Sequence, residues 1–162
     1  MGKVLSKFTN GFPGTISRAV DAVVATFVNK ESTASIPFGG PVMMKNDGKG
    51  VQNFTCTIST SADTLAAVLG IAVRNGDKTP DTYGSNLAAY APKEHVDVLT
   101  RGCIVVPVNA GTPKPGGKVY WNTSGFTATY TQHAVAEITN MRWKSEKDSN
   151  GCAEAVIIER QI

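Results

Sequence analysis

The chain has 162 residues and a formal net charge of +3, with 41% hydrophobic and 18% charged residues. This length predicts a single domain with room for a core, and the hydrophobic content excludes a disordered chain. No apolar run reaches the roughly 18 residues that a membrane-spanning helix needs. The basic residues are too scattered for a nucleic-acid interface. We therefore expect neither a membrane nor a nucleic acid as a partner.

The first 19 residues show neither a sustained helical period nor clean alternation, and Gly, Ser and Thr are frequent among them. We interpret residues 1–19 as an extended N-terminal arm, and the alternative is a frayed terminus. Three apolar side chains in this polar segment, Phe8, Phe12 and Ile16, favour an arm that docks on another surface. Residues 20–162 are then expected to form a single β domain.

Strand and turn patterns alternate through the first half of this domain. Strands are expected at 20–28, 42–44, 51–58 and 71–74. The pair Asp47-Gly48 is a strong hairpin signal, because both residues accept the backbone conformation of a tight turn. We therefore expect a hairpin between the second and third of these strands, and a polar loop over 78–92.

Residues 59–69 form the one helical candidate. Ser61 or Asp63 can cap its N-terminus, and the segment 65–67 contains good helix formers. Only about one or two turns fit before Gly70, so the expected helix is short.

The last third of the domain shows the clearest strand patterns. His95–Arg101 alternates, Gly102 predicts a turn, and 104–108 is a solid apolar run. Pro107 cannot donate to a ladder, which predicts an edge strand or a bulge at that position. Further strands are expected at 119–121, 127–131, 134–143 and 153–162. About eight to ten short strands with one small helix predict an all-β fold, either a small β-barrel or a jelly-roll-like sandwich.

The chain offers no complete catalytic or metal-binding motif. Nucleophiles, bases and orienting groups occur only as single candidates, namely Cys103 or Cys56, His95 or His133, and Asp97 or Asp63. None lies in a recognisable nucleophile motif, and covalent catalysis needs all three groups together. His95 and Asp97 share one face of a strand, but a metal site needs more ligands than two. We therefore expect no enzyme, no cofactor and no metal.

Three cysteines, Cys56, Cys103 and Cys152, lie far apart in or beside strand patterns. No CxxC pair exists, which argues against a zinc site of the paired-cysteine type. We interpret the cysteines as buried small apolar residues. A single disulfide stays an open alternative, because spacing alone does not decide it.

Six sequence blocks follow one another in a specific order. They are Gly14–Arg18, Ile36–Val42, Leu69–Arg74, Tyr83-Gly84, Ala89–Gly102 and Gly116–Tyr120. Their order and spacing resemble the capsid cement (decoration) proteins of tailed bacteriophages, while from Ala134 onward the likeness lies only in the β pattern. The resemblance implies a virion protein of β-barrel or jelly-roll fold without enzymatic activity. It also implies binding to the outer capsid surface and bridging of neighbouring major capsid protein subunits.

In such a protein the arm is expected to lie along a capsid subunit or a neighbouring copy, where it can pair as an added strand. Its expected anchors are Phe8, Phe12, Ile16 and Arg18. A homo-oligomer is expected, either a dimer or a trimer on the symmetry axes of the capsid.

Two other functions stay open at this point. A carbohydrate- or receptor-binding module on the virion surface would use Tyr83, Tyr90 and Trp121 as its aromatic contacts. Trp121 and Trp143 nevertheless fit the core better, because each sits at an apolar position of an alternating strand. A cysteine or His/Asp hydrolase is the third hypothesis.

Overall fold

The structure, a computed structural model, describes residues 10–76 and 89–158. Twelve strands form in these two ranges, and all the secondary structure described there is β. The predicted all-β class is confirmed. Within the described residues, no helix is present that could cross a membrane.

The helix expected at 59–69 is wrong. This stretch contains strand β5 (Thr64–Ala66), which pairs in parallel with strand β11 (Ala136–Trp143). The Oγ atom of Ser59 accepts hydrogen bonds from the backbone N–H groups of Ser61 and Ala62, and these bonds fix a turn where the helix would start. Side chains that bond to nearby backbone compete with a helix, and so short a segment gains little from helix formation.

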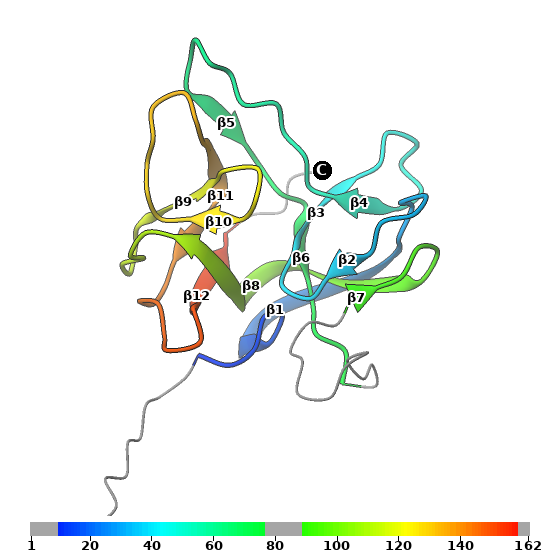
Figure 1. Cartoon of the computed structure of the whole chain (residues 1–162). Coiled ribbons are helices and arrows are strands. Elements are labelled where there is room, and N and C mark those ends of the chain that lie inside the picture. The colour runs from blue at the N-terminus through cyan, green and yellow to red at the C-terminus, as the bar shows by residue number, and fades with distance from the viewer. Residues whose placement is uncertain (1–9, 77–88, 159–162) are drawn as a thin grey trace, which may run out of the picture.

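Five strands close into a barrel. They are β8 (His95–Ala110), β9 (Lys118–Trp121), β10 (Phe126–Thr127), β11 and β12 (Cys152–Ile157). Each is hydrogen-bonded to the next in the order β10-β9-β11-β12-β8, and β10 pairs back onto β8 in parallel. This last pairing completes the ring, which Figure 1 shows around the yellow, orange and red strands.

The remaining strands except β5, which pairs with β11 of the barrel, form a second unit, here called the wing. Its sheet runs from β8 through β6 (Gly70–Ala72) and β3 (Pro41–Met44) to β4 (Val51–Asn53). Strand β1 (Ile16–Val28) pairs with β8, and β2 (Ile36–Pro37) with β7 (Ala89–Tyr90). The β3–β4 pairing confirms the hairpin predicted from Asp47-Gly48, although β4 ends at Asn53.

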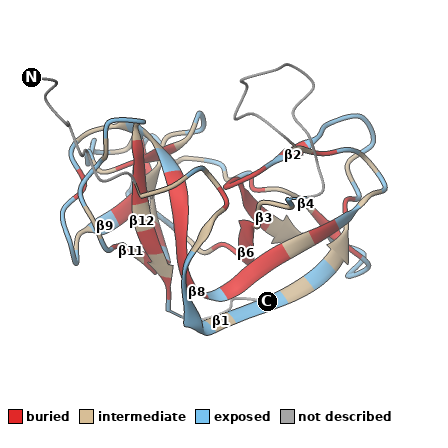
Figure 2. Cartoon of the chain, turned by 90° about the horizontal axis from the view of Figure 1, so that it is seen from below, coloured by how far each residue is buried: buried red, intermediate tan, exposed pale blue. Residues whose placement is uncertain are grey.

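Each unit has its own hydrophobic core. Barrel strands bury Phe126, Ile138 and Trp143, and that core continues under Ile71 of β6. The wing core contains Ile36, Phe38, Val42, Val51, Leu69, Ala72, Tyr90, Val96 and Val98. Strand β8 contributes to both cores, and Figure 2 shows it passing from the barrel into the wing as a mostly buried strand.

The turn expected at Gly102 is a kink inside one continuous strand of 16 residues. Gly102 has a φ of +121°, a conformation that side chains with a Cβ rarely adopt. Residues 19–22 of β1 bulge out opposite it, because Arg18 pairs with Cys103 and Val23 with Arg101. A Cβ on Gly102 would lie 3.0 Å from the Cα of Ala22. The kink lets a single strand join two units.

Candidate interaction surfaces

Residues 10–15 of the expected arm are fastened to the body of the protein. The backbone N–H of Asn10 donates to Oδ2 of Asp148 (2.8 Å), and its side-chain amide donates to the carbonyl of Cys152 (3.2 Å). Further along, the N–H of Gly14 donates to the carbonyl of Val105 on β8 (2.9 Å). The described base of the arm therefore has a fixed position on the barrel.

The ring of Phe12 is held at the surface by a cation–π contact. The guanidinium carbon of Arg74 lies 5.3 Å from the ring centroid of Phe12 and 5.1 Å from that of Phe38. Nε of Arg74 also donates to the carbonyl of Pro13 (3.1 Å). Phe12 is 45% exposed, so this contact orients the ring without covering it.

Two of the other expected anchors contact their own domain. Ile16 packs against the barrel core, and Nε of Arg18 lies 2.9 Å from Oε1 of Glu154 on β12. The hydrogen bond to Glu154 raises the pKa of Arg18. Both residues belong to β1, which begins four residues before the expected start of the β domain at 20. Phe8 lies outside the described residues, so the shared anchoring role stays a prediction.

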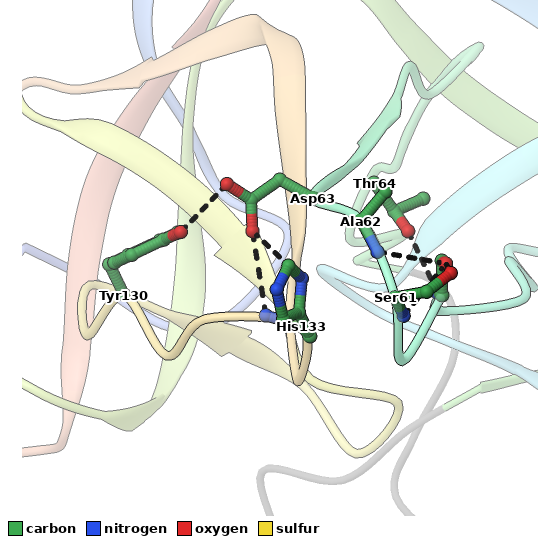
Figure 3. Close-up of polar contacts among 7 residues, drawn as sticks. Ser61, Ala62, Asp63, Thr64, Tyr130 and His133 are labelled. Atoms are coloured by element: carbon green, nitrogen blue, oxygen red, sulfur yellow. Dashed lines mark hydrogen bonds and ion pairs between the residues drawn. The ribbon is translucent and has the colours of Figure 1, made fainter.

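An aspartate, a tyrosine and a histidine meet at the edge of the barrel (Figure 3). Oδ2 of Asp63 accepts a hydrogen bond from the Tyr130 hydroxyl (2.8 Å), which raises the pKa of Tyr130. Oδ1 of Asp63 lies 3.4 Å from the backbone nitrogen of His133 and 3.5 Å from its Nδ1. In Figure 3 Ser61 points away from His133, and a tyrosine hydroxyl occupies the second carboxylate oxygen. The cluster thus fastens the loop before β11 to the start of β5.

The other candidate catalytic groups lie apart from this cluster. Asp97 accepts a hydrogen bond from the Thr26 hydroxyl (2.7 Å), and His95 is exposed opposite Val28. In the two described ranges no three His, Cys, Asp or Glu side chains are grouped as a metal site would require. The Asp63–His133 contact could not be predicted, because nothing in the sequence signals a pairing between residues 70 positions apart.

The three cysteines are free thiols, so the disulfide alternative is not realised in the structure. Cys103 and Cys152 are buried, as expected, and Cys56 is half-buried. Burial raises the pKa of all three thiols. A raised pKa reduces the thiolate fraction at neutral pH, which makes these groups poor nucleophiles.

Of the aromatic residues considered for sugar binding, the two that the structure describes, Tyr90 and Trp121, pack into the cores of different units. Tyr90 is buried in the wing core, and its hydroxyl donates to the carbonyl of Val73 (2.6 Å). Trp121 packs edge-on against Phe54 and Phe126 at the barrel core. Tyr83 lies outside the described residues.

Comparison with known proteins bears on the function. The profile of the phage structural cement protein family (E217 gp24/Pam3 gp6) matches residues 3–158. The chain belongs to this family. A cement protein of this kind is a structural component of the virion, which agrees with the resemblance seen in the sequence.

The fold of this cement protein is similar to that of a chain in "The capsid of Myoviridae Phage XM1". The TM-score is 0.66 at 15% sequence identity, and the similarity covers 98% of this chain and 97% of the other. At this identity the likeness concerns the fold alone. No curated protein matched the sequence.

Proposed function

We propose that this protein binds the outer surface of the phage capsid and bridges neighbouring major capsid protein subunits, which stabilises the shell. Its membership of the structural cement family supports the proposal. The structural observation that carries it is the fastened base of the arm, with Phe12 exposed beside it. A fixed base reduces the conformational entropy that an arm loses on binding.

The described contacts suggest a division of roles among the four expected anchors. Phe8 and Phe12 would contact the capsid, since large aromatic side chains dominate the energetics of protein interfaces. Ile16 and Arg18 would instead hold the start of β1 on the barrel, through the core and through Glu154. Binding on both sides of a seam opposes the separation of capsid subunits, and several modest contacts add up to firm retention. This function needs contact area and no reaction centre.

Cosedimentation with expanded capsids that lack the protein tests this proposal. We expect the full chain to pellet with the capsids in a saturable manner, and deletion of residues 1–9 to abolish pelleting without unfolding the β domain. Phe12→Ala should weaken binding about tenfold, which corresponds to about 1.4 kcal/mol for one aromatic anchor.

Leu65→Ala is the matched control for Phe12→Ala. Leu65 is an exposed apolar residue on β5, which Figure 1 places at the opposite end of the molecule from the first residues of the described chain. We expect this variant to bind like the wild type. Unchanged binding of the chain that lacks residues 1–9 would refute the role of the arm.

A further inference from the structure

A row of side chains runs across three strands on the outer face of the barrel. Leu65 of β5 pairs with Glu137 of β11, and Glu137 pairs with Tyr120 of β9. Residues directly opposite each other lie on the same face of a sheet. Ala136 and Ile138 are fully buried, so Glu137 between them points away from the core, together with its row.

Two adjoining hollows lie along this row and share Lys118, Tyr120 and Tyr130 in their walls. One has a volume of about 310 Å³ and is also lined by Asp63. The other has a volume of about 260 Å³ and is also lined by Trp143. We call the two together the tyrosine groove. The larger hollow alone reaches the lower end of the range of small-molecule sites, about 300–1,000 Å³.

The two tyrosines shared by the hollows form an aromatic pair. The ring centroids of Tyr120 and Tyr130 are 5.7 Å apart, and the ring planes are inclined by 52°. Tyr130 is 50% exposed, and its hydroxyl donates to Oδ2 of Asp63 (2.8 Å), as Figure 3 shows. This hydrogen bond orients the ring, so its apolar face is available to a ligand at a low entropic cost.

The charged groups of the tyrosine groove balance one another. Nζ of Lys118 lies 3.0 Å from Oε2 of Glu137 on the outer face. Asp63 lines one hollow and Lys114 lines the other, and both are exposed. The formal charges of the lining residues therefore sum to zero. Carboxylates accept hydrogen bonds and ammonium groups donate them, so a ligand hydroxyl, which does both, can bond to either.

A buried donor beside the second hollow has no hydrogen-bond partner in residues 10–76 and 89–158. It is Nε1 of Trp143, a residue that is 1% exposed. The neighbouring ring atom, Cδ1, would lie 3.6 Å from a Cβ added to Gly117, which also lines this hollow. The N–H edge of the indole thus lies next to the groove. An unpaired buried donor is unfavourable, so an oxygen atom that reaches it is favoured.

We propose that the tyrosine groove binds a neutral saccharide. The C–H face of a sugar ring covers Tyr130, and the sugar hydroxyls bond to Asp63, Glu137 and Lys118. A purely apolar ligand would leave these charged groups without partners, and a charged ligand would meet a group of its own sign. The proposal does not depend on capsid binding. It gives the virion a saccharide contact in addition to the structural role of the protein.

An array of neutral, sialylated and sulfated glycans, probed with the full chain, is the first test. We expect binding to neutral glycans. Titration with maltohexaose, cellohexaose and chitohexaose then measures the dissociation constant by calorimetry. Tyr130→Ala should raise this constant about tenfold or more, because the sugar loses the aromatic face on which it lies.

Phe12→Ala is the matched control, since Phe12 is a similarly exposed aromatic residue at the base of the arm. It should leave saccharide binding unchanged, while Tyr130→Ala should leave capsid cosedimentation unchanged. Thermal unfolding confirms that each variant is folded. If Tyr130→Ala unfolds, Glu137→Gln replaces one acceptor oxygen at nearly constant shape and should raise the dissociation constant about threefold or more.

The spectrum of the ¹⁵N-labelled protein contains one indole N–H signal for each of the two tryptophans. Trp121→Phe assigns them, and saccharide should shift the signal of Trp143. An array without bound neutral glycans, or with sulfated or sialylated glycans alone, would overturn the proposal. So would equal affinity of folded Tyr130→Ala, or of folded Glu137→Gln in its place. Lost capsid cosedimentation with intact saccharide binding would refute only the function proposed above.

Discussion

The barrel and the wing share strand β8, but they differ in how completely their strand edges are paired. In the barrel, the pairing of β10 with β8 closes the ring. In the wing, a single bridge between Asn29 and Val51 joins the end of β1 to β4 within the described residues, and buried polar groups such as Asn29 tie its loops together. This difference suggests that the closed barrel provides most of the stability and that the wing, with the adjacent arm, provides the surfaces for protein partners.

Removing a barrel side chain should have the largest effect on folding. Phe126 on β10 is 1% exposed and stacks edge-on with Trp121 at a centroid distance of 5.3 Å. Phe126→Ala should lower the free energy of unfolding by about 3–5 kcal/mol, because it leaves a cavity where the ring closes. Urea denaturation followed by tryptophan fluorescence measures this change. Tyr130→Ala, at a half-exposed aromatic, should cost about 1 kcal/mol or less, and equal losses would contradict the account.

Asn29 tests whether buried polar contacts hold the wing together. Its amide donates to the carbonyls of Ala34 (3.3 Å), Tyr90 (3.1 Å) and Ala91 (3.2 Å). Asn29→Ala leaves these groups without their partner and should cost about 2–3 kcal/mol. Hydrogen exchange should then show lost protection in the wing while the barrel stays protected. Uniform loss in both units would argue against separate stability, and Asn109→Ala at an exposed site provides the control.

The kink in β8 can be tested with two glycine substitutions. Gly102→Ala adds a Cβ at a positive φ and within 3.0 Å of Ala22, so we expect a cost of about 1–3 kcal/mol. Gly116→Ala also has a positive φ, but nothing lies within 4 Å of its added Cβ, so about 1 kcal/mol is expected. The difference between the two variants in a denaturation assay isolates the contact with β1. No difference would mean that the close approach of the strands is unimportant.

A pH-dependent effect on stability should appear in alkaline solution. Burial raises the pKa of Tyr90 from 10.0 to about 12. Between these values the unfolded chain loses a proton that the folded protein retains, so stability should fall as pH rises through this window. Thermal unfolding at a series of pH values measures the slope. Tyr90→Phe should reduce the slope, and an unchanged slope would show that other groups cause it.

Local signals in the sequence were enough for some features of the fold. The hairpin at Asp47-Gly48 follows from turn chemistry, and burial of Trp143 follows from its apolar position in an alternating strand. The hairpin and the burial of Trp143 depend on neighbouring residues, and the family resemblance depends on the order of sequence blocks along the chain. The sequence contains both kinds of information, which is why these features could be predicted.

Features that depend on distant partners could not be predicted in this way. Strand β5 replaces the expected helix because it pairs with β11, far away in the chain. Gly102 signals a turn and a kink equally well, and only β1 packed against it decides between them. A valine-rich run such as β1 has the same sequence pattern whether it is buried or exposed. The candidate contact surfaces were therefore only partly visible beforehand.

The central claim is that this protein stabilises a capsid by bridging its subunits. The most direct test is to heat DNA-filled capsids that lack the protein, with and without added full chain, and to record the temperature at which DNA is released. The account predicts a higher release temperature once the binding sites are saturated, and no increase with the chain that lacks residues 1–9. Saturating binding that leaves the release temperature unchanged would contradict it.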